Sequence, residues 1–457
     1  MKQLNNRLEQ TEFRKLLSIA FPMIVSQTSD TVMLFVDRLF LSYLGKLHIA
    51  ASMSGGLTHY VFVSFFVGTV GYVNAIVAQY YGSGQKHQCS RSTSQAVYLA
   101  LTCFPILLLL ISPMRHFFSL AGHGEEQIAL EYAYFRILMF GAVFMVIRNA
   151  FNGFFIGIGK TRMVMIANIV AMVVNVPCNY LLIFGKMGFP AMGIEGAAVG
   201  TICGSFAGLL VLLGTYFSKQ FRGTYKTHEE WRFNPRLLVK LLKFGLPAGT
   251  EMFLNVMAFN VFLQFMHSYG EDVAAAVTIT FNWDMVAFIP MIGLGIATTA
   301  RVGQHIGGGN IKGARHTVKL AMGMGAVYAG SMIALFLFAT RSLVTLFTGG
   351  FSGDEGAVVS LAVIMLRLAS IYTLADATQL VFAGALRGAG DTRWVMWISV
   401  IMHWILAVAT FIMIRILNVS PVGMWLFLIG FVIALGLVMF FRFQRGKWEK
   451  IQLIEKN

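Results

Sequence analysis

The chain has 457 residues, of which 57% are hydrophobic and only 12% are charged. Soluble globular domains carry roughly 25% charged residues, so this composition excludes an ordinary soluble globule. The 35 Lys and Arg residues outnumber the 20 Asp and Glu residues, and the resulting net charge of +15 raises the question of a nucleic-acid partner.

Long apolar segments follow one another along the whole chain. Examples are ILMFGAVFMVI at 137–147, MVMIANIVAMVVNVPCNYLLIF at 163–184 and WLFLIGFVIALGLVMFF at 425–441. With their flanks, such segments reach the ~18 to 20 apolar residues that a helix needs to cross hydrocarbon. The sequence therefore predicts an all-α polytopic membrane protein with about twelve transmembrane helices, each roughly 20 to 30 residues long.

The first 17 residues, MKQLNNRLEQTEFRKLL, contain neither a compact apolar region nor a small-residue cleavage site. We therefore expect no cleaved signal peptide, and the first span serves as its own membrane signal. Cys89, Cys103, Cys178 and Cys203 lie in or beside apolar spans without CxxC or metal-like spacing. We expect free thiols and no cofactor.

Basic residues are concentrated in alternate connections between the spans. The basic segments lie at 2–15, 86–91, 160–162, 219–236, 312–315 and 442–447. The connections between them hold acids such as Glu125, Glu271 and Asp354, with fewer bases. Since Lys and Arg remain on the cytoplasmic side of a membrane protein, both termini are expected in the cytoplasm and the number of crossings is even. This placement argues against a nucleic-acid partner.

The hexapeptide GIGKTR at 157–162 resembles the end of a phosphate-binding loop. That motif, G-x-x-x-x-G-K-[ST], requires a glycine five positions before Gly159, where backbone N–H groups would point at the phosphates, but position 154 is Phe. The chain repeats the phrase as GAGDTR at 388–393, with Asp391 in place of the lysine. Because an acid cannot bind phosphate as that lysine does, we interpret both phrases as structural turns.

The repeated phrase belongs to an internal duplication. FNGFFIGIGKTRMVM at 151–165 aligns with FAGALRGAGDTRWVM at 382–396, an offset of 231, and Pro22 aligns with Pro247 at an offset of 225. A repeated six-helix unit has parallel orientation, so we expect a pseudo-axis along the membrane normal and a cavity between the halves. The predicted domains are an N-lobe (1–218), a cytoplasmic connecting loop (219–238) and a C-lobe (239–457).

Ionisable side chains inside the spans are the main candidates for function, since a charge in hydrocarbon costs ~2.5 kcal/mol or more unless it is paired or hydrated. The candidates are Asp37 in the first span, Glu251 in the seventh, Asp284 in the eighth and Asp376 in the tenth. Asp30 lies two turns before Asp37 on the same helical face. Asp376 has polar neighbours at helical spacing, among them Tyr372.

Two interpretations of these acids remain open. Each acid is either structural, pairing with Arg38, Arg367 or a backbone donor, or functional, because intramembrane acids mark ion and substrate pathways. Burial favours the protonated form of a carboxyl group, and a hydrated cluster of carboxylates suits Na+ instead. A cationic solute would compete for the same negative charge, and that competition is the basis of antiport.

The fifth span contains NVPCN, in which Pro177 frees a carbonyl and bends the helix. Asn175 and Asn179 then share one face around the bend; the alternative is a proline kink that lines nothing. His59 and His403 have no metal-type partner at helical spacing. We expect them to be packed or hydrogen-bonded core histidines.

Three segments carry a resemblance to a known family: FPMIVSQTSDTVMLFVDRLFLSYLG at 21–45, NVPCNYLLIFGKMGFPAMGIEGAAVGT at 175–201 and DATQLVFAGALRGAGDTR at 376–393. On these segments the chain resembles a multidrug and toxic compound extrusion (MATE) transporter of the prokaryotic type, over essentially its whole length. The resemblance implies the MATE fold, two pseudo-symmetric six-helix bundles forming a V. It also implies export of amphiphilic, often cationic compounds, driven by inward movement of H+ or Na+.

The resemblance further implies a site for cation coupling and substrate binding in the N-lobe. Asp37 matches the first-helix aspartate of the family's N-lobe cation site. Asn175, Asn179 and Thr201 match its polar partners, and Tyr134 on the fourth helix is a looser match.

In the C-lobe, Asp376 matches the family's tenth-helix acid. Members of the Na+-coupled type carry a glutamate on the seventh helix, eight residues after the proline, where this chain has Asn255; this departure favours H+. Glu251 lies one turn earlier on the same face and is expected to substitute, whereas Asp284 matches no general family site and its role is open. The implied Na+ sites are Asp37 with Asn175 and Asn179, or Glu251 with Asp376.

The predicted function is secondary antiport, in which an amphiphilic, cationic drug or toxic compound leaves the cell in exchange for H+ or Na+. The expected partners are the lipid bilayer and small substrates, and the expected state is a monomer in the bacterial inner (cytoplasmic) membrane.

A flippase for a lipid-linked saccharide would need a basic cavity, whereas the intramembrane charges are mainly acidic. A membrane-embedded enzyme would need a motif such as HExxH or GxSxG, which we do not find in the spans, and a receptor would need no duplicated halves.

Overall fold

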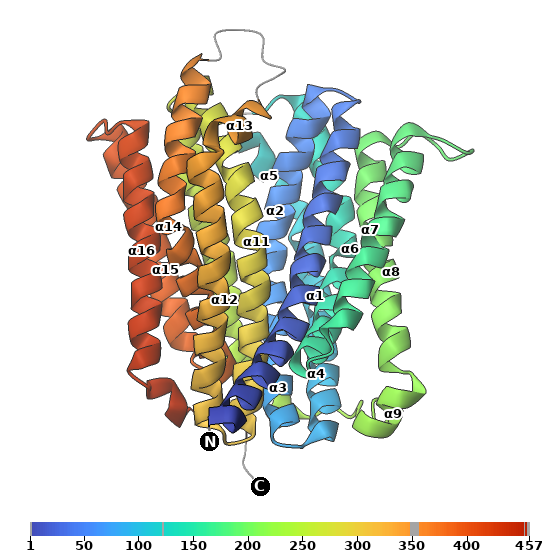
Figure 1. Ribbon diagram of the computed structural model, residues 1–457. Helices are drawn as coiled ribbons and strands as arrows, with labels where there is room; N and C mark the ends of the chain where they lie inside the picture. The colour runs from blue at the N-terminus through green and yellow to red at the C-terminus, as the bar shows by residue number, and fades with distance from the viewer. Residues whose placement is uncertain (1, 121–122, 348–355, 452, 455–457) are drawn as a thin grey trace. The chain divides into compact units, whose positions relative to one another are not determined.

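The computed structural model describes residues 2–120, 123–347, 356–451 and 453–454, and this part of the chain is helical (Figure 1). The helices are α1 (Lys2–Ser42), α2 (Lys46–Gly71), α3 (Val73–Gly82), α4 (Lys86–Leu109), α5 (Ile111–Leu120), α6 (Glu125–Gly157), α7 (Thr161–Phe184), α8 (Gly193–Tyr216), α9 (Lys219–Tyr225), α10 (Pro235–His267), α11 (Glu271–Gly307), α12 (Ile311–Phe338), α13 (Thr340–Thr345), α14 (Gly356–Ala389), α15 (Thr392–Arg415), α16 (Pro421–Gln444) and the 3-10 helix η1 (Lys447–Lys450).

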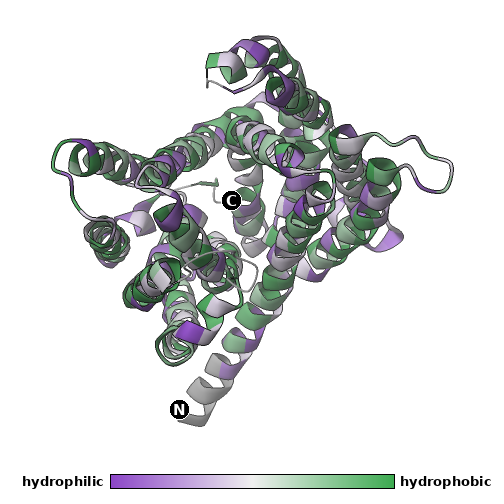
Figure 2. Ribbon diagram, turned by 90° about the horizontal axis from the view of Figure 1, so that it is seen from above, coloured by the Kyte–Doolittle hydropathy of each residue, from purple (hydrophilic) through white to green (hydrophobic). Residues whose placement is uncertain are grey.

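Twelve spans within the described residues are long and apolar enough to cross a membrane. Helices α2 and α3 form one of them, Lys46–Gly82, while α5, α9, α13 and η1 are too short. Hydrophobic residues predominate along the long helices (Figure 2). The prediction of an all-α membrane protein with about twelve transmembrane helices is confirmed.

The helix boundaries reproduce the internal repeat. The α2–α3 span covers Lys46–Gly82 and α11 covers Glu271–Gly307, so that both ends are related by the offset of 225. Helix α7 covers Thr161–Phe184 and α15 covers Thr392–Arg415, so that both ends are related by the offset of 231. The predicted duplication therefore extends to the ends of individual helices.

The repeated phrases GIGKTR and GAGDTR form the turns that join α6 to α7 and α14 to α15. Gly159 has φ 75° and Gly390 has φ 95°, a left-handed conformation that glycine adopts without steric cost. Asp391, in place of the lysine of the first phrase, accepts a hydrogen bond of 2.8 Å from Arg442 of α16. Both phrases are thus structural, as expected.

Other glycines of the same segments allow helices to approach closely. A Cβ on Gly157 of α6 would lie 2.8 Å from the carbonyl oxygen of Asn74 in α3. A Cβ on Gly388 of α14 would lie 2.4 Å from the carbonyl oxygen of Thr299 in α11. The two contacts are equivalent in the repeat, so the same packing constraint acts in both halves.

The chain divides into two compact units. The first-half unit comprises Val25–Phe253, Gly307–Gly309 and Leu453–Asn457, and the second-half unit comprises Met1–Ile24, Leu254–Ile306 and Asn310–Gln452. These units differ from the predicted lobes, 1–218 and 239–457, at two helix ends. The start of α1 belongs to the second-half unit, and the start of α10 belongs to the first-half unit. Three expectations stay predictions: that the two lobes are the functional domains, that residues 219–238 are a cytoplasmic connecting loop, and that a cavity lies between the halves.

Glycine contacts explain this exchange of helix ends. In the first-half unit, a Cβ on Gly68 of α2 would lie 2.8 Å from Cα of Gly249 in α10. In the second-half unit, a Cβ on Gly293 of α11 would lie 2.9 Å from the backbone nitrogen of Ile24 in α1. The residues of one contact are related to those of the other by the offset of 225, so each half binds the start of the other half's first helix in the same way.

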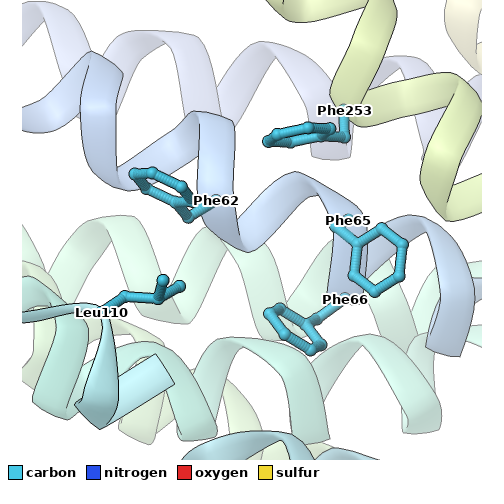
Figure 3. A pocket seen from close by; sticks show the side chains of 5 residues that line it. All are labelled: Phe62, Phe65, Phe66, Leu110 and Phe253. Atoms are coloured by element: carbon cyan, nitrogen blue, oxygen red, sulfur yellow. The ribbon is translucent and has the colours of Figure 1, made fainter. Parts of the chain in front are cut away.

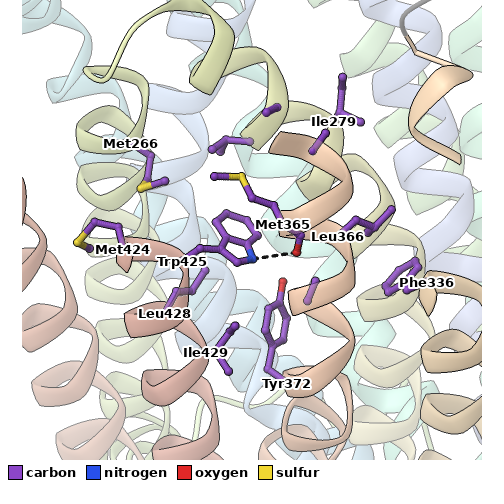
Figure 4. Close-up of a cluster of buried hydrophobic side chains, with 14 of the residues drawn as sticks. Met266, Ile279, Phe336, Met365, Leu366, Tyr372, Met424, Trp425, Leu428 and Ile429 are labelled. Carbon is purple, nitrogen blue, oxygen red and sulfur yellow. Dashed lines mark hydrogen bonds between the residues drawn. The ribbon is translucent and has the colours of Figure 1, made fainter. Parts of the chain in front are cut away.

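A cluster of large apolar side chains forms part of the core of the second-half unit (Figure 4). Trp425 of α16 is fully buried in it, and its indole N–H donates a hydrogen bond of 3.0 Å to the carbonyl oxygen of Met365 in α14. This bond satisfies a polar group that would otherwise be costly to bury. Tyr372 of α14 lies in the same cluster, and this position brings its hydroxyl to the acids described below.

The start of α1 and the segment after α16 lie at the same end of the second-half unit. Glu12 of α1 forms an ion pair of 2.6 Å with Arg301 near the end of α11. Glu449 of η1 forms an ion pair of 2.5 Å with Arg315 near the start of α12. Since α11 and α12 are consecutive, both pairs mark one end of the unit; that this end is cytoplasmic stays a prediction.

We expect Gly388→Ala to destabilise the protein by about 1 to 3 kcal/mol, because the added Cβ meets the rigid backbone of Thr299 and forces the helices apart. The measurement is thermal unfolding in detergent followed by tryptophan fluorescence. The matched control is Gly330→Ala in α12, where a Cβ meets nothing within 4 Å. The control should be neutral or stabilising because alanine has the higher helix propensity; equal melting temperatures for both variants would contradict the packing role.

Candidate functional site

Helices α7 and α8 of the first-half unit pack with their backbones in contact. Glycines at every fourth position of α8, namely Gly196, Gly200, Gly204 and Gly208, form a stripe along one face of this helix. A Cβ on Gly204 would lie 2.7 Å from the carbonyl oxygen of Ala171 in α7. Small residues at this spacing let membrane helices approach closely, and here they bring the polar side chains of α7 within reach of α1.

The carboxylate of Asp37 lies in this region, 3% exposed. The amide Nδ2 of Asn179 donates a hydrogen bond to Asp37 Oδ1, and the hydroxyl of Thr201 donates one of 3.2 Å to Asp37 Oδ2. Asn175 in turn donates to Thr201 Oγ1 at 3.5 Å. A Cβ on Gly200 would lie 1.8 Å from Asn179 Oδ1, so the position of Asn179 depends on the glycine.

All hydrogen-bond partners of Asp37 within the described part of the chain are neutral. The exposed Arg38 interacts with it electrostatically, but no ion pair joins the two among the described residues. The oxygen Asn179 Oδ1 is buried without a hydrogen-bond partner. The cluster therefore combines an uncompensated carboxylate with a spare oxygen, a set of atoms that can hold a proton or a Na+ ion.

Tyr134 of α6 lies beside this cluster. It is 7% exposed and interacts electrostatically with Asp37. Its ring packs on α2, where a Cβ on Gly56 would lie 3.4 Å from it. The structure thus brings together four of the predicted residues of the N-lobe, Asp37, Asn175, Asn179 and Thr201, with Tyr134 adjacent; their role in coupling stays a prediction.

The second-half unit contains a different acidic cluster. Asp284 of α11 is 8% exposed and accepts a hydrogen bond of 3.0 Å from the hydroxyl of Tyr372 in α14. Asp376, one turn after Tyr372, interacts electrostatically with Asp284. The sequence identified both acids as candidates but did not predict that they interact with each other. The available signal was Tyr372, already noted on the polar face of Asp376.

Asn255 and Glu251, one turn apart on α10, fall into different units. Asn255 donates a hydrogen bond of 2.8 Å to Ser399 of α15, and its Oδ1 is buried without a partner. Glu251 is 3% exposed and belongs to the first-half unit, whereas Asp376 belongs to the second-half unit. Two expectations stay predictions. One is a Na+ site formed by Glu251 with Asp376, and the other is that Glu251 substitutes for a glutamate at position 255.

The polar clusters of the two halves are not related by the repeat. The offset of 225 relates Asp37 to Phe262, and the offset of 231 relates Asn175 to Leu406; both counterparts are fully buried and apolar. Conversely, Asp284 corresponds to His59, which is 9% exposed. The halves therefore share their packing but place their ionisable groups differently.

The histidines singled out in the sequence lie in packed surroundings. Nδ1 of His403 lies 2.7 Å from the carbonyl oxygen of Ser399, and the ring of His403 packs edge-on against Phe431. Within the described residues, neither His403 nor His59 belongs to a group of three or more potential metal ligands.

An apolar pocket of about 180 Å³ lies in the first-half unit (Figure 3). Its lining consists of Phe62, Phe65, Phe66, Leu110 and Phe253. Pockets for drug-sized ligands measure roughly 300 to 1,000 Å³, so this one is large enough for an aromatic ring but not for a whole drug.

Comparisons with known proteins agree with this architecture. A model of the MatE family matches residues 22–181 and again 247–412, once in each half. The multidrug resistance protein MdtK of Edwardsiella ictaluri is 26% identical over 446 residues, covering 96% of this chain and 95% of that protein. MdtK of Photorhabdus laumondii is 28% identical over 455 residues, covering 96% of each.

Solved structures share the fold. A MOP superfamily transporter from Pyrococcus furiosus, described as having a binding pocket of reverse polarity, superposes with a TM-score of 0.87 at 17% identity and covers 96% of this chain and 97% of its own. An outward-facing multidrug resistance MATE transporter of the same superfamily gives 0.86 at 18% identity, with the same coverage. Since the family model matches both halves and most of the chain, this protein belongs to the multidrug and toxic compound extrusion (MatE) family.

Proposed function

We propose that the protein is a secondary antiporter that exports amphiphilic, cationic compounds in exchange for H+ or Na+ by alternating access. Family membership and the multidrug resistance relatives support efflux of this substrate class. The observation that carries the proposal is Asp37, a buried carboxylate inside a membrane span that has only neutral hydrogen-bond partners among the described residues. Such a charge is costly in hydrocarbon, so binding of a small cation relieves that cost.

Thr201 provides a way for the cluster to respond to the ion. Its single hydroxyl proton has two acceptors within reach, Asp37 Oδ2 at 3.2 Å and the carbonyl oxygen of Ala197 at 3.0 Å. A hydroxyl donates only one hydrogen bond at a time. When a proton or Na+ neutralises Asp37, the hydroxyl turns to Ala197, and the bond between α8 and α1 is released.

The acids of the second-half unit support the same function. Asp284 and Asp376 repel each other when both are ionised, and Tyr372 donates to only one of them. The pair is thus suited to hold one proton or one monovalent cation. We propose that it contributes a second coupling site, and Asn255 in place of an acid favours H+ over Na+.

In this scheme the membrane potential drives export. Each net elementary charge that moves inward across 100 mV releases about 2.3 kcal/mol. Two coupling ions that enter for one monovalent organic cation that leaves move one such net charge. The proposal places the protein in the bacterial inner membrane as a monomer with both termini in the cytoplasm, where the basic segments lie under the positive-inside rule.

Asp37→Asn should abolish ion-driven transport while the protein still inserts into the membrane, because the amide keeps the shape of the side chain but cannot bind a proton or compensate Na+. The measurement is ethidium counterflow in proteoliposomes with proton and sodium gradients imposed separately. Asp272→Asn, which removes an exposed acid at the start of α11, is the control for the change in charge. Normal gradient-driven exchange in Asp37→Asn would end the assignment.

Gly200→Ala should weaken coupling without altering any ionisable group. The added Cβ would displace Asn179, whose Oδ1 lies 1.8 Å from that position, and would remove the amide donor from Asp37. The lost charge-assisted hydrogen bond is worth about 1.5 to 3 kcal/mol, so we expect the gradient-driven rate to fall roughly tenfold or more. Gly214→Ala on the same helix, where a Cβ meets nothing within 4 Å, should transport normally; equal rates in the two variants would refute the dependence on Asn179.

A further inference from the structure

We infer that Asp30 binds the cationic group of the transported compound, while Asp37 binds the coupling ion. The inference rests on the proposed antiport function and assigns the residue that recognises the positive charge of its substrate. The two acids lie on α1 two turns apart, but they differ in access. The Asp30 side chain is 36% exposed, whereas Asp37 is 3% exposed inside its cluster. The greater exposure of Asp30 favours a bulky cation there, and the burial of Asp37 favours an ion of atomic size.

One oxygen of Asp30 is available to a ligand. Asn168 of α7 donates through Nδ2 to Asp30 Oδ2 at 3.0 Å and to Ser26 Oγ at 2.7 Å. The closest cation to Asp30 Oδ1 is Nη2 of Arg148, at 3.9 Å, which is beyond hydrogen-bond distance. Oδ1 therefore has a compensating charge nearby but no close donor within the described part of the chain.

Arg148 and Asn168 are buried and incompletely paired. Arg148 of α6 is 7% exposed and Asn168 is 3% exposed. Neither Arg148 Nη1 nor Asn168 Oδ1 has a hydrogen-bond partner among the residues that the structure describes. The guanidinium is thus a loose counter-ion, and Asn168 holds the carboxylate through its Nδ2 alone. A ligand ammonium group that donates to Asp30 Oδ1 makes the close bond that Arg148 does not make.

An aromatic ring completes the surroundings of Asp30. Tyr60 of α2 is 38% exposed and interacts electrostatically with Asp30. The face of a tyrosine ring attracts organic cations, including quaternary ammonium groups that cannot donate hydrogen bonds. The partly exposed carboxylate and tyrosine together suit a cation attached to an apolar body.

The internal repeat shows which residues occupy the positions of Asp30 and Asn168 in the other half. The offset of 225 relates Asp30 to Asn255, and the offset of 231 relates Asn168 to Ser399. Asn255 and Ser399 form a hydrogen bond of 2.8 Å at these positions of the second-half unit, with the direction reversed, since Asn255 donates where Asp30 accepts. A neutral side chain thus maintains the helix contact at this position. Asp30→Asn therefore introduces the side chain that the second half carries at this position, where the counterpart of Arg148 is the neutral Gln379.

The test compares the binding of two phenanthridines to the purified protein in nanodiscs. Ethidium carries a fixed positive charge, and the phenanthridine that lacks its N-ethyl group is uncharged at alkaline pH. Asp30→Asn should weaken ethidium binding by roughly tenfold or more, the value of a charge-assisted contact, and should leave the affinity for the uncharged compound within about twofold. Asp30→Glu should restore most of the ethidium affinity, and Asp272→Asn should behave as wild type.

The outcomes separate this inference from the proposed function. If wild-type proteoliposomes show no ion-driven ethidium transport, the antiport proposal fails, and the inference fails with it. If the wild type transports ethidium and Asp30→Asn binds it equally well, the inference alone fails. If Asp30→Asn weakens both compounds equally, the charge is not what is recognised, and the inference is likewise overturned.

Discussion

The structure depends on one constraint, the cost of placing a carboxylate in hydrocarbon. Asp37 meets it through neutral donors on α7 and α8, and those donors reach it because α8 has no side chain where the two helices meet. The glycine stripe of α8 and the polar cluster around Asp37 are therefore parts of one arrangement. A larger residue at Gly200 would affect the carboxylate without touching it.

Duplication separates what packing requires from what chemistry requires. Close backbone contacts recur at equivalent positions, as with Gly157 and Gly388. The intramembrane acids do not recur, since Asp37 corresponds to a buried phenylalanine and Asp284 to a histidine. The halves thus share helix contacts, whereas their intramembrane acids occupy different positions. The proposed cation sites of the two halves therefore differ in structure although the fold is shared.

Hydropathy and internal repetition were sufficient to predict the helices, their number and the duplicated organisation. The grouping of Asp37 with Asn175, Asn179 and Thr201 came from family resemblance, because spacing alone does not determine which helix faces meet. The contacts of Asp284 with Tyr372 and of Asp30 with Arg148 were missed for the same reason: each joins helices far apart in sequence. The exchange of helix ends between the units was also missed, because the lobes were assigned in chain order.

That exchange bears on how the protein can be assembled. The opening residues of α1 pack with helices made at the end of synthesis, and the start of α10 covers a glycine of α2 made long before it. Neither half therefore contains all of its own packing contacts. In the first half, the contact of Gly68 with α10 forms only after α10 has been inserted into the bilayer. A gene split at the connecting segment would have to supply both fragments together, since each carries a helix end that the other lacks.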